Sequence, residues 1–141
     1  MQVRDIMTVR VVTVEMDDRL DVVKQIFDNL DFHHLLVLDE RKRLSGVVSD
    51  RDLLKALSPY IGGVAETARD TATLNKRVHQ IMSRKLVTVH PQASLAECAQ
   101  KFLEHRISCV PVVDEDFKPL GIVSWRDALK HLLANQTPTP G

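Results

Sequence analysis

The sequence repeats itself once, and this duplication constrains the possible folds more than any other feature. A shift of 75 positions places residues 3–57 on residues 78–132 without a gap. About 20 of the 55 aligned pairs are identical, among them Gly46 with Gly121. We therefore predict two copies of one structural unit, at residues 1–57 and 78–134. A linker at residues 58–77 joins them, and residues 135–141 are predicted to form a disordered tail.

Each copy has the pattern of an α/β unit with the order β-α-β-β-α. In the first copy, β-branched and apolar runs alternate with a stripe of apolar residues at helical spacing. The expected elements are a strand at 11–14, a helix at 20–30, paired strands at 35–38 and 46–48, and a helix from 52. The second copy repeats this order, and its first helix is expected to begin with a capping box at Ser94 and Glu97. The polar part of the linker, residues 66–76, leaves room for a short helix.

Composition excludes several classes of protein. Lys and Arg together number 19, as do Asp and Glu, so the formal net charge is zero and general nucleic-acid binding is not expected. No apolar run has the roughly 18 residues that a membrane span needs, and no apolar signal core follows Met1, so a cytoplasmic protein is predicted. Cys98 and Cys109 fall on predicted apolar faces, and we interpret both as thiols of the core.

A polar motif occurs in both copies between a strand and a helix: Ser49-x-x-Asp52 and Ser124-x-x-Asp127. Two interpretations stand side by side. A serine followed three residues later by an acid is a helix-capping pair. The same position also offers amide N–H groups to a phosphate and a carboxylate to the hydroxyls of a ribose. Both interpretations are compatible with each other.

The order of several short segments resembles that of a CBS (cystathionine-β-synthase) repeat. In the second copy these are Ile81-Met82-Ser83, Val87-Thr88-Val89-His90-Pro91, Val110-Pro111-Val112-Val113-Asp114 and Gly121-Ile122-Val123-Ser124-Trp125-Arg126-Asp127. The resemblance implies two repeats that pack through their sheets with pseudo-two-fold symmetry. It implies two clefts that bind adenosyl nucleotides such as AMP, ADP, ATP or S-adenosylmethionine. It also implies a homodimer, for which Leu53, Leu54, Leu57, Leu129, Leu132 and Leu133 are candidate contacts unless they close the core.

The resemblance also assigns roles to individual residues. Asp52 and Asp127 inherit the ribose contact, and Ser49 and Ser124 match the hydroxyl position of the motif. Thr8, Ser83, Val12 and Val87 fall at the adenine end of the clefts, although both valines also suit an ordinary core. His33 and His34 precede a buried strand, where they either face a phosphate or mark a strand end. Their counterparts Ser108 and Cys109 are not basic, so the two clefts are expected to differ. Arg51 and Arg126 are candidates to reach a phosphate, with solvent exposure as the alternative.

These features favour a regulatory module that senses an adenosyl nucleotide and signals to an unknown effector protein. The alternative is a scaffold whose clefts are empty or hold another ligand. An enzyme is not expected, because no nucleophile with its base, no cofactor motif and no metal-ligand spacing is apparent. Single-stranded nucleic-acid binding would need basic and aromatic surfaces that the chain lacks. The copies also leave little room for a fused catalytic domain.

Overall fold

The fold consists of two compact units, each built from parts of both sequence copies. The structure is a computed structural model that describes residues 1–57, 59, 63 and 67–135. Of the predicted tail at 135–141, Asn135 belongs to a helix and residues 136–141 lie outside the described residues. Unit 1 joins Met1–Val11 to the residues from Val87 onward. Unit 2 is Val12–Leu86. None of the described helices is long and apolar enough to cross a membrane.

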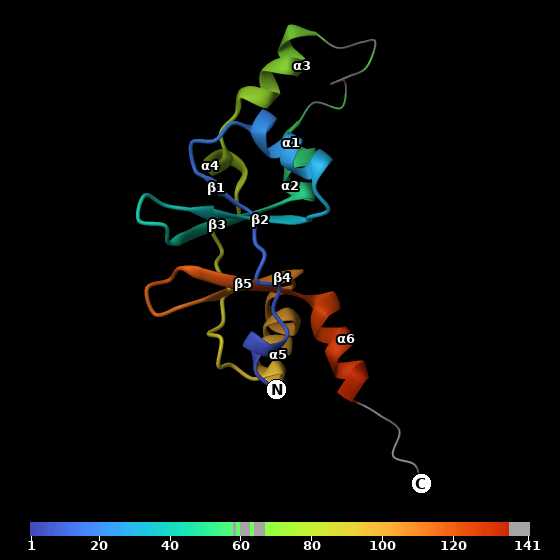
Figure 1. Cartoon of the computed structure of the whole chain (residues 1–141). Coiled ribbons are helices and arrows are strands. Elements are labelled where there is room, and N and C mark those ends of the chain that lie inside the picture. The colour runs from blue at the N-terminus through green and yellow to red at the C-terminus, as the bar shows by residue number, and fades with distance from the viewer. Residues whose placement is uncertain (58, 60–62, 64–66, 136–141) are drawn as a thin grey trace. The chain divides into compact units, whose positions relative to one another are not determined.

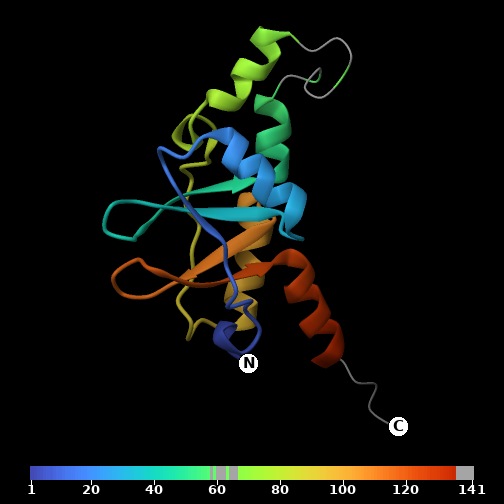
Figure 2. The ribbon, with the colours of Figure 1, turned by 45° about the horizontal axis from the view of Figure 1, so that its top comes forward.

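Unit 2 has a three-stranded sheet with helices beside it (Figure 1). Strand β1 (Thr13–Glu15) runs parallel to β2 (His34–Leu38), which forms an antiparallel hairpin with β3 (Leu44–Ser49). Helices α1 (Leu20–Asn29) and α2 (Asp50–Ala56) lie on the same side of this hairpin (Figure 2). The predicted linker contains α3 (Ala68–Ala72) and the 3-10 turn η2 (Thr73–Asn75), and α4 (Val78–Ile81) follows.

Unit 1 repeats this plan with one strand fewer. After the 3-10 turn η1 (Val3–Asp5), it contains α5 (Leu95–His105), the antiparallel hairpin of β4 (Cys109–Val113) and β5 (Pro119–Ser124), and α6 (Trp125–Asn135). The strand expected near Val87 is reduced to one parallel bridge, between Val89 and Val112. In unit 2 the amide of Leu36 donates to the carbonyl of Val12, but the matching residue Pro111 has no N–H to donate. One rung of the ladder is therefore lost.

Each unit has its own aliphatic core, as the low aromatic content of the chain predicts. Burial of these side chains supplies the main stabilising free energy of each unit. The apolar stripe of α5 is only partly buried, since Leu95 and Cys98 face the core whereas Leu103 is 78% exposed. The buried core residues of unit 2 are Val14, Leu20, Val23, Leu35, Val37, Val48, Leu53, Val78 and Met82. Those of unit 1 are Val3, Ile6, Val89, Leu95, Cys98, Val110, Val112, Val123 and Ala128.

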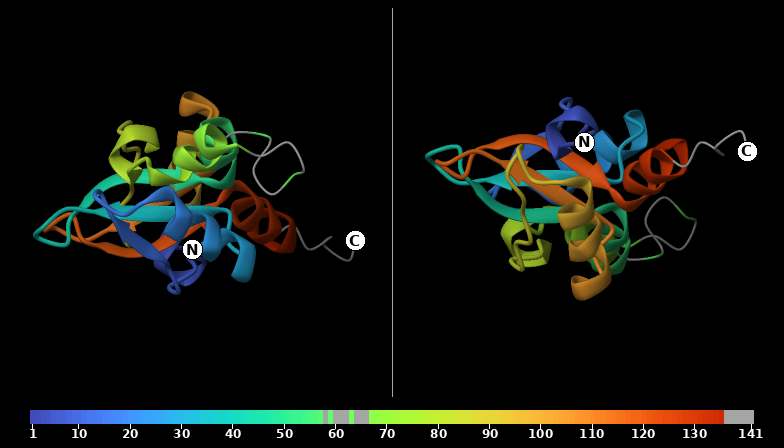
Figure 3. Two further views of the ribbon diagram at one scale, coloured as in Figure 1. Left: turned by 90° about the horizontal axis from the view of Figure 1, so that it is seen from above. Right: turned by 90° about the horizontal axis from the view of Figure 1, so that it is seen from below.

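The leading segment of each sequence copy packs in the unit formed mostly by the other copy. Val3 and Ile6, from the first copy, lie in the core of unit 1, and the amide of Val3 donates to the carbonyl of Ala93 at 2.8 Å. Val78 and Met82, from the second copy, lie in the core of unit 2. The blue N-terminal segment in Figure 3 thus belongs with the orange hairpin of unit 1, where Thr8 pairs with Ile122.

A glycine in the last strand of each unit permits this packing. A Cβ atom on Gly121 would lie 2.7 Å from the sulfur of Met7 and 2.9 Å from the carbonyl oxygen of Thr8. A Cβ atom on Gly46 would lie 2.7 Å from the sulfur of Met82 and 3.0 Å from the carbonyl oxygen of Ser83. Only glycine leaves room for the crossing segment, which explains why this residue stands at the same place in both copies.

We expect Gly121→Ala to destabilise the protein by about 1–3 kcal/mol, the usual cost of overpacking a core. The methionine side chain can move away from a new methyl group, but the backbone oxygen of Thr8 cannot do so without losing its strand pairing. Urea unfolding measures the change. At a site without this crowding, Gly→Ala would stabilise by about 0.4–1 kcal/mol, so an increase in stability would contradict the packing. Gly46→Ala should behave in the same way as Gly121→Ala.

Candidate functional site

The first polar motif forms a complete capping box at the start of α2. The Ser49 hydroxyl oxygen accepts a hydrogen bond from the Asp52 amide at 3.0 Å. The Ser49 amide donates to Oδ2 of Asp52 at 2.9 Å, and both side chains are half-buried. The capping interpretation of this motif is therefore correct. Since Oδ2 carries the only hydrogen bond to this carboxylate among the described residues, Oδ1 is left to accept others.

The second motif has the same geometry at the start of α6. The Asp127 amide donates to the hydroxyl oxygen of Ser124 at 3.1 Å, and the Ser124 amide donates to Oδ2 of Asp127 at 3.2 Å. Both residues are half-buried. The duplication has thus preserved a serine and a carboxylate in one fixed arrangement at the end of each hairpin. Each carboxylate is thus held in place by the amide of its serine.

The crossing segments bring one further hydroxyl residue to each hairpin. Ser83 exchanges two backbone hydrogen bonds with Val47, of 2.9 and 3.1 Å, two residues before Ser49. Thr8 exchanges two with Ile122, of 2.9 and 3.0 Å, two residues before Ser124. Both Thr8 and Ser83 are exposed. The sequence predicted these residues but not their partners, because each hydroxyl comes from the opposite sequence copy.

The two candidate valines, Val12 and Val87, are both half-buried and belong to different units. Val12 is half-buried and packs against the core of unit 2, while its carbonyl oxygen accepts from the Leu36 amide at 3.1 Å. Val87 is half-buried in unit 1. The core interpretation therefore describes the side chain of Val12. Its backbone carbonyl is already engaged in the sheet.

The histidines lie at the start of β2, beside the beginning of α2. His33 is 71% exposed at its side chain, and its Nδ1 lies 3.0 Å from Oδ2 of Asp50. The His33 carbonyl also accepts from the Asp50 amide at 3.0 Å. Burial lowers the pKa of His34, against a smaller opposing effect of Asp50. Partial burial raises the pKa of Asp50. Its hydrogen bonds to His33 and to the Arg51 amide, together with the charges of both histidines, outweigh this effect and hold the pKa below its usual value. An ionised Asp50 is thus the nearest partner of His33, and the sequence analysis did not single it out.

Unit 1 keeps the backbone contact but not these side chains. The amide of Trp125, which matches Asp50, donates to the carbonyl of Ser108 at 3.1 Å. Trp125 is 47% exposed, and Ser108 is exposed. Arg126 and Arg51 are both exposed as well, in agreement with either of the interpretations that the sequence left open. The structure therefore places Ser108 and Arg126 near the second motif and Arg51 beside the first.

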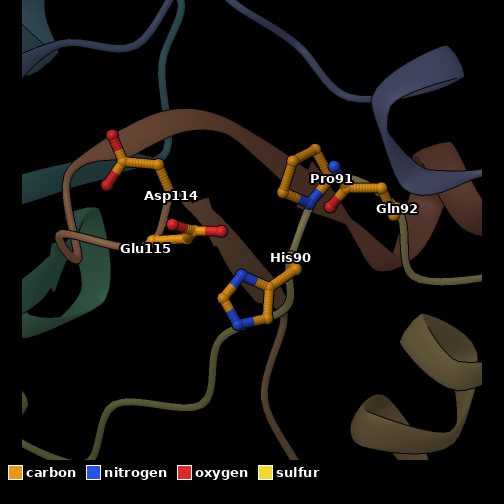
Figure 4. Close-up of a pocket in the computed structure, with 5 residues that line it drawn as sticks. All are labelled: His90, Pro91, Gln92, Asp114 and Glu115. Atoms are coloured by element: carbon orange, nitrogen blue, oxygen red, sulfur yellow. The ribbon is translucent and has the colours of Figure 1, made fainter.

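A pocket in unit 1 lies apart from all these residues. It is lined by His90, Pro91, Gln92, Asp114 and Glu115, none of which the sequence analysis selected for binding. In Figure 4 the His90 ring lies close to the Glu115 side chain, while Asp114 belongs to the turn of the β4–β5 hairpin. Oδ1 of Asp114 already accepts the amides of Asp116 and Lys118, both at 2.9 Å. The described residues contain no group of three or more His, Cys, Asp or Glu side chains that could hold a metal ion.

Both cysteines are buried and free. Burial raises the pKa of Cys98 to about 11 and that of Cys109 to about 12. At neutral pH both are therefore protonated thiols with little nucleophilic character. This agrees with their interpretation as core residues.

Two consecutive units of this fold, each with a Ser–Asp box at the end of its hairpin, define a tandem α/β repeat protein. The CBS domain model matches residues 3–59 and 78–134, and the chain belongs to the CBS domain family. The two-repeat α/β architecture predicted from the sequence is thereby confirmed.

Solved structures of CBS domain pairs are similar over nearly the whole chain. The structure of CBSX2, a protein of Arabidopsis thaliana, in complex with AMP is 27% identical, with a TM-score of 0.78 over 96% of this chain and 98% of that one. The CBS domain pair of protein MJ0100, in complex with 5′-methylthioadenosine and S-adenosyl-L-methionine, is 26% identical. Its TM-score is 0.77 over 97% of this chain and 98% of that one.

Relatives by sequence fall into two groups. A CBS domain-containing protein of Dictyostelium discoideum is 29% identical over 139 residues, which is 98% of this chain and 95% of that protein. A homoserine O-acetyltransferase of Methanosalsum zhilinae is 28% identical over 137 residues. The chain spans only 25% of the length of that enzyme.

We expect Ser124→Ala to lower the stability of the ligand-free protein by about 1 kcal/mol, because it removes the acceptor for the Asp127 amide. Ser124→Thr should restore most of the loss, since its hydroxyl can accept the same bond. Ser94→Ala serves for comparison, because it removes another helix cap of the same unit, in which the Ser94 hydroxyl accepts from the Glu97 amide at 3.0 Å. Urea unfolding of the three variants measures these changes. If Ser124→Ala leaves the midpoint unchanged, the cap contributes nothing to stability.

Proposed function

We propose that this protein is a regulatory module that binds an adenosyl nucleotide at the Ser–Asp box of each unit. The observation that carries the proposal is the pair of preorganised carboxylates, Asp52 and Asp127, each fixed by one oxygen and available through the other. Two similar CBS pairs have been solved with adenosyl ligands, which supports the same ligand class here.

The chemistry of the box suits a nucleoside. A carboxylate accepts hydrogen bonds from the two hydroxyls of a ribose, and charge-assisted bonds of this kind are stronger than neutral ones. The hydroxyls of Thr8 and Ser83 lie two residues from the boxes along the paired strands, where they offer further polar contacts. We propose that Val12 and Val87 border the adenine and that Ser49 and Ser124 face the phosphate end of the ligand.

The phosphate end differs between the units. In unit 1 the amides of Trp125 and Asp127 already donate to Ser108 and Ser124, so we propose that the Arg126 side chain and the positive end of the α6 dipole favour the phosphate. In unit 2 we propose that Arg51 carries this role and that His33 and His34 contribute when they are protonated. Signalling to an effector protein completes the proposal. The enzymes among the relatives are about four times longer than the stretch they share with this chain, so a regulatory domain is the part that this chain would represent.

We expect Asp127→Ala to weaken AMP binding by about 1–3 kcal/mol, the scale of losing hydrogen bonds to a charged group. Isothermal titration calorimetry measures the affinity. Asp70→Ala is a matched control, because Asp70 forms the same kind of capping box with Thr67 at the start of α3, with a 2.9 Å bond from the Thr67 amide to its Oδ2. That variant should lose helix stability and keep its AMP affinity.

The sensor function would be refuted if the wild-type protein bound none of five ligands below millimolar concentration: AMP, ADP, ATP, adenosine and S-adenosylmethionine. The scaffold function, with empty or non-adenosyl clefts, would then be the better description. A ligand present at 100 times its Kd stabilises the native state by about 2.7 kcal/mol, so thermal shifts provide an inexpensive first screen of the panel.

We also propose that the protein forms a homodimer through exposed leucines of α6 and α2. Leu129 and Leu133 are 46% and 70% exposed, and Leu54 is 72% exposed. The alternative that these leucines close the core holds for part of the predicted set: Leu53 is 5% exposed and Leu57 packs against the core of unit 2. The remaining stripe runs along α6 at helical spacing and joins Trp125, Leu129, Leu132 and Leu133.

We expect Leu129→Ser with Leu133→Ser to convert a dimer into a monomer, because two exposed apolar contacts would be replaced by hydroxyls. Light scattering at tens of micromolar protein measures the mass. Leu103→Ser is the control, since Leu103 is 78% exposed on a different helix, α5. A monomeric wild-type protein under these conditions would contradict the proposal.

A further inference from the structure

The two boxes have the same backbone but different charges around them. In each unit the loop before the first hairpin strand meets the start of the helix that follows the hairpin, because His34 pairs with Ser49 and Cys109 pairs with Ser124. The duplication therefore allows a comparison position by position. Four positions at this end differ in charge or polarity: Asp31 against Arg106, His33 against Ser108, His34 against Cys109, and Asp50 against Trp125.

At the positions compared, the charges of unit 1 are mostly positive. Arg106 is exposed at the end of α5, in the left-handed backbone conformation with a φ of 50°, and Arg126 is exposed beside Asp127. The crossing segment adds Arg10, two residues after Thr8. Three cations thus accompany one carboxylate, for a net charge of +2 over these positions: Arg10, Arg106, Arg126 and Asp127.

The matched positions in unit 2 carry more acid. Asp31 and Asp50 join Asp52, and they offset the three cations, so the net charge over the same positions is zero: Asp31, Asp50, Arg51, Asp52, Arg84 and Lys85. One of these cations is partly committed, since Arg84 donates to the carbonyl of His79 at 3.2 Å. His34 has its pKa lowered by burial, and His33 is held at 3.0 Å by the Asp50 carboxylate.

We propose that the two sites select their ligands by charge. The box of unit 1 takes an adenosyl ligand that carries phosphate, and the box of unit 2 takes an adenosyl ligand without phosphate, such as one with a cationic sulfur. Asp31 and Asp50 are the specificity-determining residues of unit 2, and Arg106 is that of unit 1. This inference rests on the proposed function, since it assumes that both boxes bind an adenosyl group.

The expected size of the effect follows from electrostatics. A phosphate monoester carries about 1.5 to 2 negative charges at pH 7, and it meets two elementary charges more in unit 1 than in unit 2. At separations of about a Debye length near a protein surface, we expect a preference of about tenfold for AMP at unit 1. Salt screens such interactions, so the preference should shrink when ionic strength rises from about 0.02 M to 0.2 M.

The test titrates AMP and S-adenosylmethionine into the wild-type protein, Asp52→Ala and Asp127→Ala, with calorimetry at pH 7.5. Asp127→Ala should weaken the main AMP binding event about tenfold or more, while Asp52→Ala should change it less than about threefold. For S-adenosylmethionine, Asp52→Ala should weaken binding more than Asp127→Ala does. Charge selection would be overturned if both variants lost the same affinity for each ligand, if the order were the opposite, or if Asp52→Ala changed the affinity for neither ligand. Adenosyl binding itself would still be established in each case.

A second variant changes selectivity without touching either box. Asp31→Asn with Asp50→Asn removes two negative charges from unit 2, and it should strengthen AMP binding at that site about tenfold, so that a second AMP binds per chain. Asp28→Asn is the matched control, an exposed acid of the same unit that pairs with Lys24 at 2.6 Å and should leave AMP binding unchanged. If the double variant binds AMP no better than the control does, the two acids do not determine selectivity. Loss of all adenosyl binding in the wild type would instead refute the proposed function itself.

Discussion

The crossing of each leading segment over a strand glycine is the contact on which the rest of the structure depends. Met7 and Thr8 lie against Gly121, and Met82 and Ser83 lie against Gly46, at distances that leave no space for a Cβ atom. The same contact buries Val3 and Val78 in the two cores and aligns Thr8 and Ser83 with the last strands. Core packing and site assembly are therefore one event in each unit, because the segment that completes the core also delivers a hydroxyl residue beside the Ser–Asp box.

Much of this fold could be predicted from the sequence because the signals are local. The helical stripe of α1, the hairpins and both Ser–Asp pairs depend on residues close together in the chain. The exchange of leading segments could not be predicted, since the shift of 75 positions shows which residues are equivalent but not which copy they pack against. The missing strand of unit 1 was open to prediction from one residue: Pro111 stands where Leu36 donates an amide, and a proline has none to donate.

The candidate site was predicted in part for the same reason. Ser49, Asp52, Ser124 and Asp127 form the capping boxes that their spacing indicates. The caps use Oδ2 of each carboxylate, so the proposed ribose contact is assigned to Oδ1. The surroundings were harder to predict. His33 was selected for its possible phosphate contact, whereas its ring lies 3.0 Å from the Asp50 carboxylate, a residue that no pattern singled out. This carboxylate lies seventeen positions away along the chain, and the pairing of β2 with β3 brings the two residues together.

A duplicated unit of this kind separates what must stay constant from what is free to change. The glycine, the serine and the acid of the box are the same in both copies because the crossing segment and the helix cap constrain them sterically. The side chains at positions 31, 33, 106, 108 and 125 are exposed instead, and the amides of Asp50 and Trp125 make the same backbone contact in both copies. Substitution there alters the charge beside the Ser–Asp box, where we propose that the ligand binds. Two sites with one geometry can thereby come to respond to two different ligands, which a module with identical sites could not distinguish.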